Sequence, residues 1–216
     1  NPFPIGDGQK LSLRVHTNGD YYNAVSLSFT EPWLGGKKPN ALSVGVYYSY
    51  QDDGFWNTSG QSEYHVGILG GSVSLATRLK WPDDYFTFVH GIAYQQYNVK
   101  NYSTLTAMPT GISNNINYNF TIARNSVDQL IYPRQGSDVS LQAQMTFPYS
   151  LVNGKDYSNL TSQERYKWLE YYKVNLRAAW YFNIFDDLVV STRARFGFLG
   201  QYNSKVGYSP FERFYV

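Results

Sequence analysis

The sequence has no cysteine and little charge. None of its 216 residues is Cys, which excludes a disulfide framework and a thiolate metal site. Charged residues make up 16% of the chain, against about 25% in an average protein. A chain with so few charges must cover its surface with uncharged polar groups, or it must keep part of that surface out of water.

A strong net charge and long apolar runs are also missing. The net charge of +2 is too small to indicate nucleic-acid binding, so we expect no nucleic acid among the partners. No stretch approaches the roughly 18 uninterrupted apolar residues of a transmembrane helix, and the opening NPFPIGDGQK contains no secretory signal. A membrane-spanning β-strand needs only about 9 to 11 residues of alternating character. These absences therefore leave a membrane barrel open.

Aromatic side chains and period-two alternation are abundant instead. Tyr, Phe and Trp make up 18% of the chain. Apolar residues alternate with small or polar ones in nine segments, which predicts nine β-strands and an all-β fold. The segments are 9–18, 23–33, 41–50, 64–79, 86–99, 115–124, 137–148, 172–184 and 188–202. Short connections rich in Asn, Asp, Gly or Pro separate some of them, and longer connections at 51–63, 100–114 and 149–171 separate others.

One short helix is predicted within the last of these connections. Thr161 is a candidate N-cap, and Glu164 follows three residues later in the sequence TSQE. This spacing is typical of a capping box, in which each side chain bonds the backbone N–H of the other residue.

The two faces of the predicted strands differ in character. In the segment 188–202, Val190 and Phe196 lie on an apolar face and Ser191 lies on the other. This second face is small and polar with a few long cations, namely Lys173, Arg177, Arg193 and Arg195. Alternation alone cannot separate a β-sandwich from a barrel that turns its apolar face to lipid. The length of the runs and the aromatic residues near strand ends, among them Trp33, Trp81 and Trp180, favour the barrel.

Four stretches together resemble the membrane barrel of the BamA family, the core subunit of the machine that inserts β-barrel proteins into the bacterial outer membrane. They are SLSFTEPWLGGKKPNALSVGVYYS (26–49), ARNSVDQLIYPRQGSDVSLQAQMTFP (123–148), YYKVNLRAAWYF (171–182) and RARFGFLGQYNSKVGYSPFERFYV (193–216). The sequences of these stretches, TEPWLGGKKP and YPRQG especially, are similar to those of the Bacteroidetes branch of the family. Their order and spacing are similar to the third to eleventh strands of the family's sixteen-stranded barrel.

The resemblance implies that residues 1–216 are part of a single outer-membrane β-barrel domain, a partial antiparallel transmembrane barrel. On this expectation the POTRA repeats, the lateral seam and the Arg-Gly-Phe loop of the family lie outside the sequence. Short connections mostly face the periplasm and long ones the outside, with TNGDYY as a short outer exception. Pro32 and Trp33 would end a strand at an interface, and Pro133 and Gly136 would form a turn that launches the next strand.

The function that the resemblance implies is non-enzymatic assembly of outer-membrane proteins, with strand edges offered to clients by β-augmentation. The implied partners are outer-membrane lipids and lipopolysaccharide, unfolded barrel clients and the lipoproteins of the assembly machine. We expect no cofactor and no metal. The polar-face cations are expected to line the lumen, where a guanidinium group can hold a returning loop or bound water.

The sequence contains no convincing catalytic set. The histidines His16, His65 and His90 fall in separate strands without metal-ligand spacing, and GILGG lacks the Lys-Ser/Thr of a phosphate-binding loop. Two other classes of function stay open. One is a passive porin or transporter barrel, and the other is a soluble β-sandwich that binds carbohydrate through exposed Tyr and Trp.

The assignment of faces makes a testable prediction. Phe196→Arg or Val190→Arg should block membrane assembly, because a cation at the bilayer midplane costs about 2 to 4 kcal/mol. Ser191→Arg, on the other face, should be tolerated. Expression and heat-modifiability on gels measure both effects, and equal tolerance of the three variants would contradict the outward orientation of Phe196 and Val190.

Overall fold

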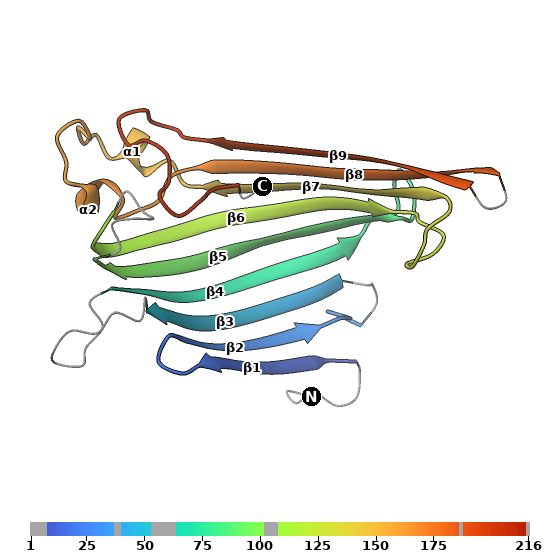
Figure 1. The fold of residues 1–216 in the computed structure, drawn as a ribbon, viewed down its shortest axis with the longest axis horizontal. Helices are drawn as coiled ribbons and strands as arrows, with labels where there is room; N and C mark the ends of the chain where they lie inside the picture. Colours follow the sequence, from blue (N-terminus) through green and yellow to red (C-terminus); the bar gives the residue numbers. More distant parts are fainter. Residues whose placement is uncertain (1–7, 37–39, 53–63, 102–107, 186–187, 215–216) are drawn as a thin grey trace.

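The fold is one antiparallel sheet whose nine strands follow their order along the chain. The computed structural model describes residues 8–36, 40–52, 64–101, 108–185 and 188–214 (Figure 1). The strands are β1 (Lys10–Asn18), β2 (Tyr22–Glu31), β3 (Asn40–Asp52), β4 (His65–Arg78), β5 (Phe86–Lys100), β6 (Gly111–Asn125), β7 (Gly136–Thr146), β8 (Tyr172–Phe185) and β9 (Leu188–Gly200). The predicted all-β antiparallel fold is confirmed.

Most strand boundaries lie within two residues of the prediction, and two of the differences have a clear physical reason. β6 begins at Gly111 rather than at residue 115, because Gly111 pairs with Val99 of β5. Apart from Ile112, the small and amide side chains of residues 111–115 are typical of a loop. Pairing with β5 and the bridge between Asn114 and Trp168 hold them extended. β7 ends at Thr146, two residues before the predicted end at Pro148, which lacks the N–H that a ladder needs.

The helices are short. The predicted capping box is present in α2 (Ser162–Arg165), where the backbone N–H of Glu164 donates to Thr161 Oγ1 at 3.3 Å and the Glu164 carboxylate accepts from the Thr161 N–H at 3.2 Å. A second helix, α1 (Tyr149–Val152), follows Pro148 and was not predicted. In the described ranges no helix is long and apolar enough to cross a membrane.

The pairing register places the apolar residues of all nine strands on one side of the sheet and the alternating polar residues on the other. Residues that pair across an antiparallel ladder point to the same side. Phe196 of β9 pairs with Leu176, which pairs with Leu141 of β7, and Leu141 pairs with Ile122 of β6. We refer to this side as the apolar face. The opposite side, from Ser12 and Arg14 in β1 to Arg193 and Arg195 in β9, is the polar face.

The apolar face has no protein cover along the described strands. Leu13, Val46, Ile92 and Phe196 are 67%, 53%, 60% and 59% exposed. A β-sandwich would bury such side chains against a second sheet, but the nine described strands form a single sheet. Exposed apolar surface on this scale matches the lipid-facing band of a membrane barrel and not a water-soluble domain.

The two ends of the sheet differ in their connections. Residues 32–39, 79–85, 126–135 and 186–187 connect strands at one end, the short-turn end. Residues 19–21, 53–64, 101–110 and 147–171 connect strands at the other, the long-loop end. Apart from 19–21, the connections at the long-loop end are as long as those at the short-turn end or longer. Outer-membrane barrels have short periplasmic turns and longer outer loops.

The buried apolar core lies over the polar face at the long-loop end. We refer to residues 147–171 and 201–214 together as the cap, and Figure 1 shows both segments at the end of the sheet where β5, β6 and β7 meet their long connections. Tyr97 of β5 stacks on Phe211 of the cap, with ring centroids 4.3 Å apart and nearly parallel planes. The buried members of this core are Tyr97, Val99, Met108, Tyr157, Tyr166, Leu169, Tyr171 and Val206. The sheet therefore has a core only where the cap covers it.

Close packing of neighbouring strands predicts a difference between two polar-face glycines. A Cβ at Gly91 would lie 2.3 Å from the carbonyl oxygen of Val73, whereas a Cβ at Gly45 would lie 3.7 Å from its nearest neighbour, the carbonyl oxygen of Leu27. Gly91→Ala should therefore destabilise the complete barrel by about 1 to 3 kcal/mol, and Gly45→Ala should change its stability little.

Urea unfolding of the complete protein in lipid vesicles, followed by Trp fluorescence, measures the difference. Equal unfolding midpoints for the two variants would show that β4 and β5 can separate without cost at Gly91.

Candidate functional site on the polar face

The predicted lumenal cations all lie on the polar face of β8 and β9. Arg177 pairs directly with Arg195, and Arg193 pairs with Ala179. The three arginines are exposed and, together with Asp138 and Ser140, line a hollow of about 270 Å³. Within the described ranges their guanidinium groups form no hydrogen bond or ion pair. Like charges opposite each other destabilise a sheet, so this surface favours an anionic partner.

Lys173 is engaged by the cap. Its Nζ lies 3.0 Å from Glu212 Oε2, and the two side chains are only 22% and 14% exposed. The same ammonium group donates to the carbonyl oxygen of Arg213 at 3.4 Å and lies 5.0 Å from the ring centroid of Phe214. Phe214 in turn occupies the space beside Gly197, where a Cβ would be 2.8 Å from its ring. The segment 201–214 is therefore held on the polar face by charge and by close packing.

Tyr171 connects this ion pair to the sheet. Its hydroxyl donates to Glu212 Oε1 at 3.1 Å and accepts from Gln144 Nε2 at 2.6 Å and from Asn115 Nδ2 at 3.0 Å. Its backbone N–H donates to Thr146 Oγ1 at 2.8 Å. Because the ring is fully buried, the bonds to Asn115, Gln144 and Thr146 fix the cap relative to β6 and β7, and the bond to Glu212 joins the two segments of the cap.

The hydrogen bonds continue across the polar face as far as β3. The amide oxygen of Gln95 accepts from Asn115 Nδ2 at 3.0 Å and from the Tyr97 hydroxyl at 3.1 Å. The amide nitrogen of Gln95 donates to the Tyr47 hydroxyl at 2.6 Å. The amide orientation lets one side chain serve as donor and acceptor at once. We refer to Tyr47, Gln95, Tyr97, Asn115, Gln144, Tyr171 and Glu212 as the polar network.

Other contacts fix the cap outside the strands. The buried carboxylate of Glu170 accepts from the backbone N–H of Ser150 and from its hydroxyl, the latter at 2.6 Å. The carboxylate of Asp156 accepts from the Ser158 hydroxyl and pairs with Lys205 at 3.2 Å, and these contacts lower the pKa of Asp156. The Lys205–Asp156 pair is 58% and 67% exposed, so it contributes little to stability.

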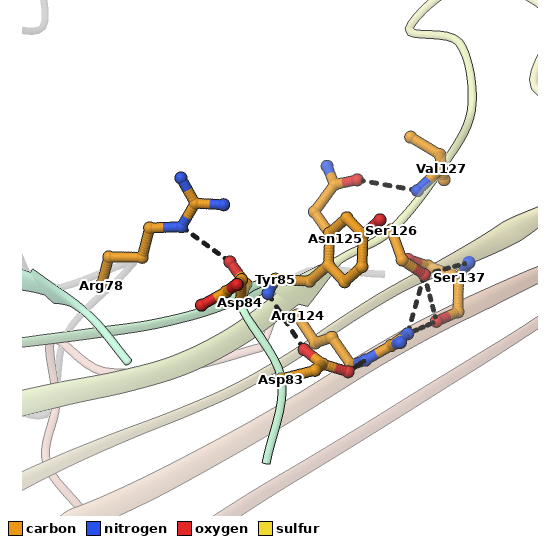
Figure 2. Close-up of polar contacts among 9 residues, drawn as sticks. All are labelled: Arg78, Asp83, Asp84, Tyr85, Arg124, Asn125, Ser126, Val127 and Ser137. Carbon is orange, nitrogen blue, oxygen red and sulfur yellow. Dashed lines mark hydrogen bonds and ion pairs between the residues drawn. The ribbon is translucent and has the colours of Figure 1, made fainter. Parts of the chain in front are cut away.

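Arg124 binds two turns together at the short-turn end, as Figure 2 shows. Its Nε lies 2.9 Å from Asp83 Oδ2 in the β4–β5 connection, and its Nη1 donates to Ser126 Oγ at 2.7 Å and to Ser137 Oγ at 2.6 Å. The guanidinium carbon lies 5.6 Å from the centroid of Tyr85. Arg124 occupies an apolar-face position, paired with Phe86, and its charge there is balanced by Asp83.

The turn residues of the YPRQG motif lie beside these contacts of Arg124. Gly136 is the first residue of β7 and has a φ of +108°. A Cβ at this position would lie 2.2 Å from the carbonyl oxygen of Ser126, so only glycine fits. Pro133 lies earlier in the same connection, where Asp128 Oδ1 accepts from the backbone N–H groups of Arg134 and Gln135 at 3.0 and 3.2 Å.

The three predicted interface tryptophans lie toward the short-turn end. Trp33 follows Pro32 in the β2–β3 connection and is 53% exposed, and Trp81 in the β4–β5 connection is 83% exposed. Trp180 lies on the apolar face of β8 and is 39% exposed. Trp168, which was not predicted as an interface residue, lies in the cap at the opposite end.

Sequence reasoning did not find Glu212, Tyr171, Asp83 or Arg124. Each of them acts through a partner far away along the chain, and no local spacing signals such a pair. The histidines lie apart: His16 packs against Tyr22, His65 against Tyr50, and His90 against Phe88. Among the described residues no group of His, Asp and Glu could hold a metal ion.

Comparisons with known proteins agree with this architecture. A family model described as the Omp85 superfamily domain matches residues 5–216. Among solved structures, the fold is similar to that of BamA from Haemophilus ducreyi lacking POTRA domains 1–3, with a TM-score of 0.66 and 18% sequence identity. The similarity covers 96% of this chain and 38% of the Haemophilus chain. The chain thus spans well under half of that relative.

The two ion pairs of the cap predict a contrast. Glu212→Gln removes a charge-assisted hydrogen bond in a largely buried site, and such bonds contribute about 1.5 to 3 kcal/mol. We expect faster hydrogen exchange and proteolysis of residues 201–214 in the complete protein. Asp156→Asn breaks the exposed pair in the same cap and should leave both rates nearly unchanged.

The double variant Lys173→Glu, Glu212→Lys exchanges the two charges and tests whether an ion pair of reversed direction can replace the natural one. It keeps an ion pair but loses the hydrogen bond from the Tyr171 hydroxyl, so it should restore only part of the protection that Glu212→Gln loses. Unchanged exchange in Glu212→Gln would show that packing alone holds the segment.

Proposed function

Because the chain belongs to the Omp85 superfamily, we propose that it forms part of the wall of a barrel that folds and inserts other β-barrel proteins into the bacterial outer membrane. The observation that carries the proposal is the family match over residues 5–216. The family also identifies the bacterial outer membrane as the location of the chain. We propose that the activity is non-enzymatic and that unfolded barrel proteins and assembly lipoproteins are the partners.

The described sheet supplies wall and lumen surface rather than the site where clients enter. Its edge strands β1 and β9 carry unpaired backbone groups on their outer sides, and such groups cannot stay unpaired inside a lipid bilayer. We propose that further strands of the same protein continue the sheet on both sides. We propose that residues 1–216 supply the third to eleventh of sixteen strands in one barrel domain. Clients would then pair by β-augmentation at a seam formed by other strands.

The apolar face and the tryptophans give this wall its place in the membrane. Uncharged, exposed side chains such as Leu13 and Ile92 contact lipid. Trp33, Trp81 and Trp180 would lie at the periplasmic boundary, where the indole N–H can reach water while the ring stays among the acyl chains. The turns at this periplasmic boundary take their shape from Pro32, Pro133 and Gly136.

The polar-face cations have distinct roles in the proposal. Lys173 holds the segment 201–214 through Glu212. Arg177, Arg193 and Arg195 lie farther along β8 and β9, toward the short-turn end. We assign them to carboxylates of chain segments that return into the lumen, because guanidinium groups bind carboxylates in a bidentate geometry.

A folding assay tests the function. The complete protein reconstituted in phospholipid vesicles should accelerate the folding of a urea-unfolded eight-stranded outer-membrane barrel severalfold over vesicles without protein. A porin reconstituted at the same density is the control for general disturbance of the bilayer. Equal acceleration by the porin would contradict an assembly function, and a steady conductance without acceleration would favour a passive channel.

A further inference from the structure

A cleft of about 540 Å³ lies within the cap between α1 and α2. Its walls come from Phe147 and Tyr149 at the start of the cap and from Lys167 and Trp168 near its end. Ligand pockets in proteins typically have volumes of about 300 to 1,000 Å³. The cleft is therefore large enough for the headgroup of a lipid or a compound of similar size.

The charge of the cleft is positive. Lys155, Arg165 and Lys167 line it together with one acid, Glu164. The Glu164 carboxylate is already engaged, because it accepts from the Thr161 hydroxyl at 2.8 Å and from the Thr161 backbone N–H at 3.2 Å. These hydrogen bonds, with a smaller contribution from Lys155, lower the pKa of Glu164. The cations thus exceed the acid in number, and the acid is held by the capping box.

Arg165 has a buried donor without a partner. Its backbone N–H completes α2 by donating to the carbonyl oxygen of Thr161 at 2.9 Å, and its Nη2 makes a long contact of 3.4 Å with the carbonyl oxygen of Leu160. Its Nε is buried and forms no hydrogen bond within the described chain. A buried guanidinium N–H without an acceptor is unfavourable. Arg165 also lines the cleft, where its guanidinium group makes only one long hydrogen bond, so a phosphate bound there would give the group a further acceptor.

The cleft also has exposed apolar side chains in its lining. The rings of Phe147 and Tyr149 lie 5.1 Å apart between centroids, and those of Tyr149 and Trp168 lie 5.2 Å apart. Phe147 and Val152 are 53% and 67% exposed. A ligand that matches the whole cleft therefore carries both a negative charge and an apolar part.

The cleft borders the apolar face of the sheet. Phe147 comes two residues after Met145 of β7, and Trp168 forms an isolated bridge with Asn114 of β6. Beside this bridge the Tyr94 hydroxyl donates to Asn114 Oδ1 at 2.8 Å, and Asn114 Nδ2 donates to the carbonyl oxygen of Lys167 at 3.2 Å. Uncharged polar groups at the end of an apolar band are typical of the level of lipid headgroups.

We propose that this cleft binds a phosphate-bearing lipid of the outer leaflet. The phosphate lies against Arg165, Lys155 and Lys167, and an acyl chain runs past Trp168 and Phe147 onto the apolar face. The bound lipid would fix the cap at the membrane surface. This inference depends on the proposed function in one respect: the long-loop end must face the outside of the outer membrane.

Native mass spectrometry of the complete protein in detergent, titrated with bisphosphorylated lipid A, tests the proposal. We expect one retained lipid. Arg165→Gln together with Lys167→Gln should weaken its binding about tenfold or more, since two charge-assisted contacts to the phosphate are lost. Lys205→Gln, which removes a cap cation outside the cleft, should leave binding unchanged. Binding that is the same in the double variant and in the unaltered protein would overturn the proposal.

Three further measurements distinguish binding of the whole lipid from binding of its phosphate group alone. Dephosphorylated lipid A should bind at least tenfold more weakly, and equal binding would overturn the role of the phosphate. Inorganic phosphate should compete only weakly, and binding of phosphate as tight as that of the lipid would overturn the role of the acyl chain. Trp168→Ala should weaken binding of the lipid but not of inorganic phosphate.

The folded state and the assembly function are followed separately. Heat-modifiability on gels shows whether each variant forms a barrel, and the vesicle assay gives its rate of client folding. A double variant that still folds clients but no longer binds lipid supports the lipid site by itself. A complete protein that binds lipid but does not accelerate client folding would contradict the assembly function and leave the lipid site intact.

Discussion

The pairing of backbone N–H and C=O groups is the constraint on which the rest of this structure depends. In a lipid bilayer an unpaired peptide group costs several kcal/mol, and the sheet meets this demand by linking nine strands in sequence order. The continuous register then fixes both faces, because one residue of slippage would turn the whole apolar set inward. Exposed Leu13, Val46 and Phe196 are the consequence of this arrangement and not a defect of packing.

The cap provides buried apolar packing at the long-loop end of the same sheet. A polar face lined by small residues has little to bury, so the cap brings its own apolar residues, such as Leu169 and Val206, and packs them on Tyr97 and Val99. The polar network and the Lys173–Glu212 pair then hold the cap at a defined position. At the opposite end Arg124 and Asp83 stabilise the turns, so both ends of the sheet rely on charges paired over long distances along the chain.

Local patterns predicted the parts of the fold that depend on local physics. Period-two alternation located all nine strands, and the spacing of Thr161 and Glu164 located α2 together with its capping box. The start of β6 was missed because Gly111 is extended only through its pairing with β5, and α1 was missed because four residues after a proline carry no periodic signal. The partners of Lys173 and Arg124 were missed because Glu212 and Asp83 lie 39 and 41 residues away.

The sequence by itself determined which residues of each strand share a face, since alternation is a property of neighbouring residues. The single sheet of the tertiary structure then left the apolar face without protein cover. Its motifs were also enough to indicate the family that residues 5–216 match. Only the tertiary structure decided which cations are engaged. Lys173 is paired with Glu212 on the folded-back segment, whereas Arg177 and Arg195 face each other and form no ion pair within the described strands. That outcome depends on where the chain returns after β9, and no pattern of adjacent residues encodes the distance between such segments.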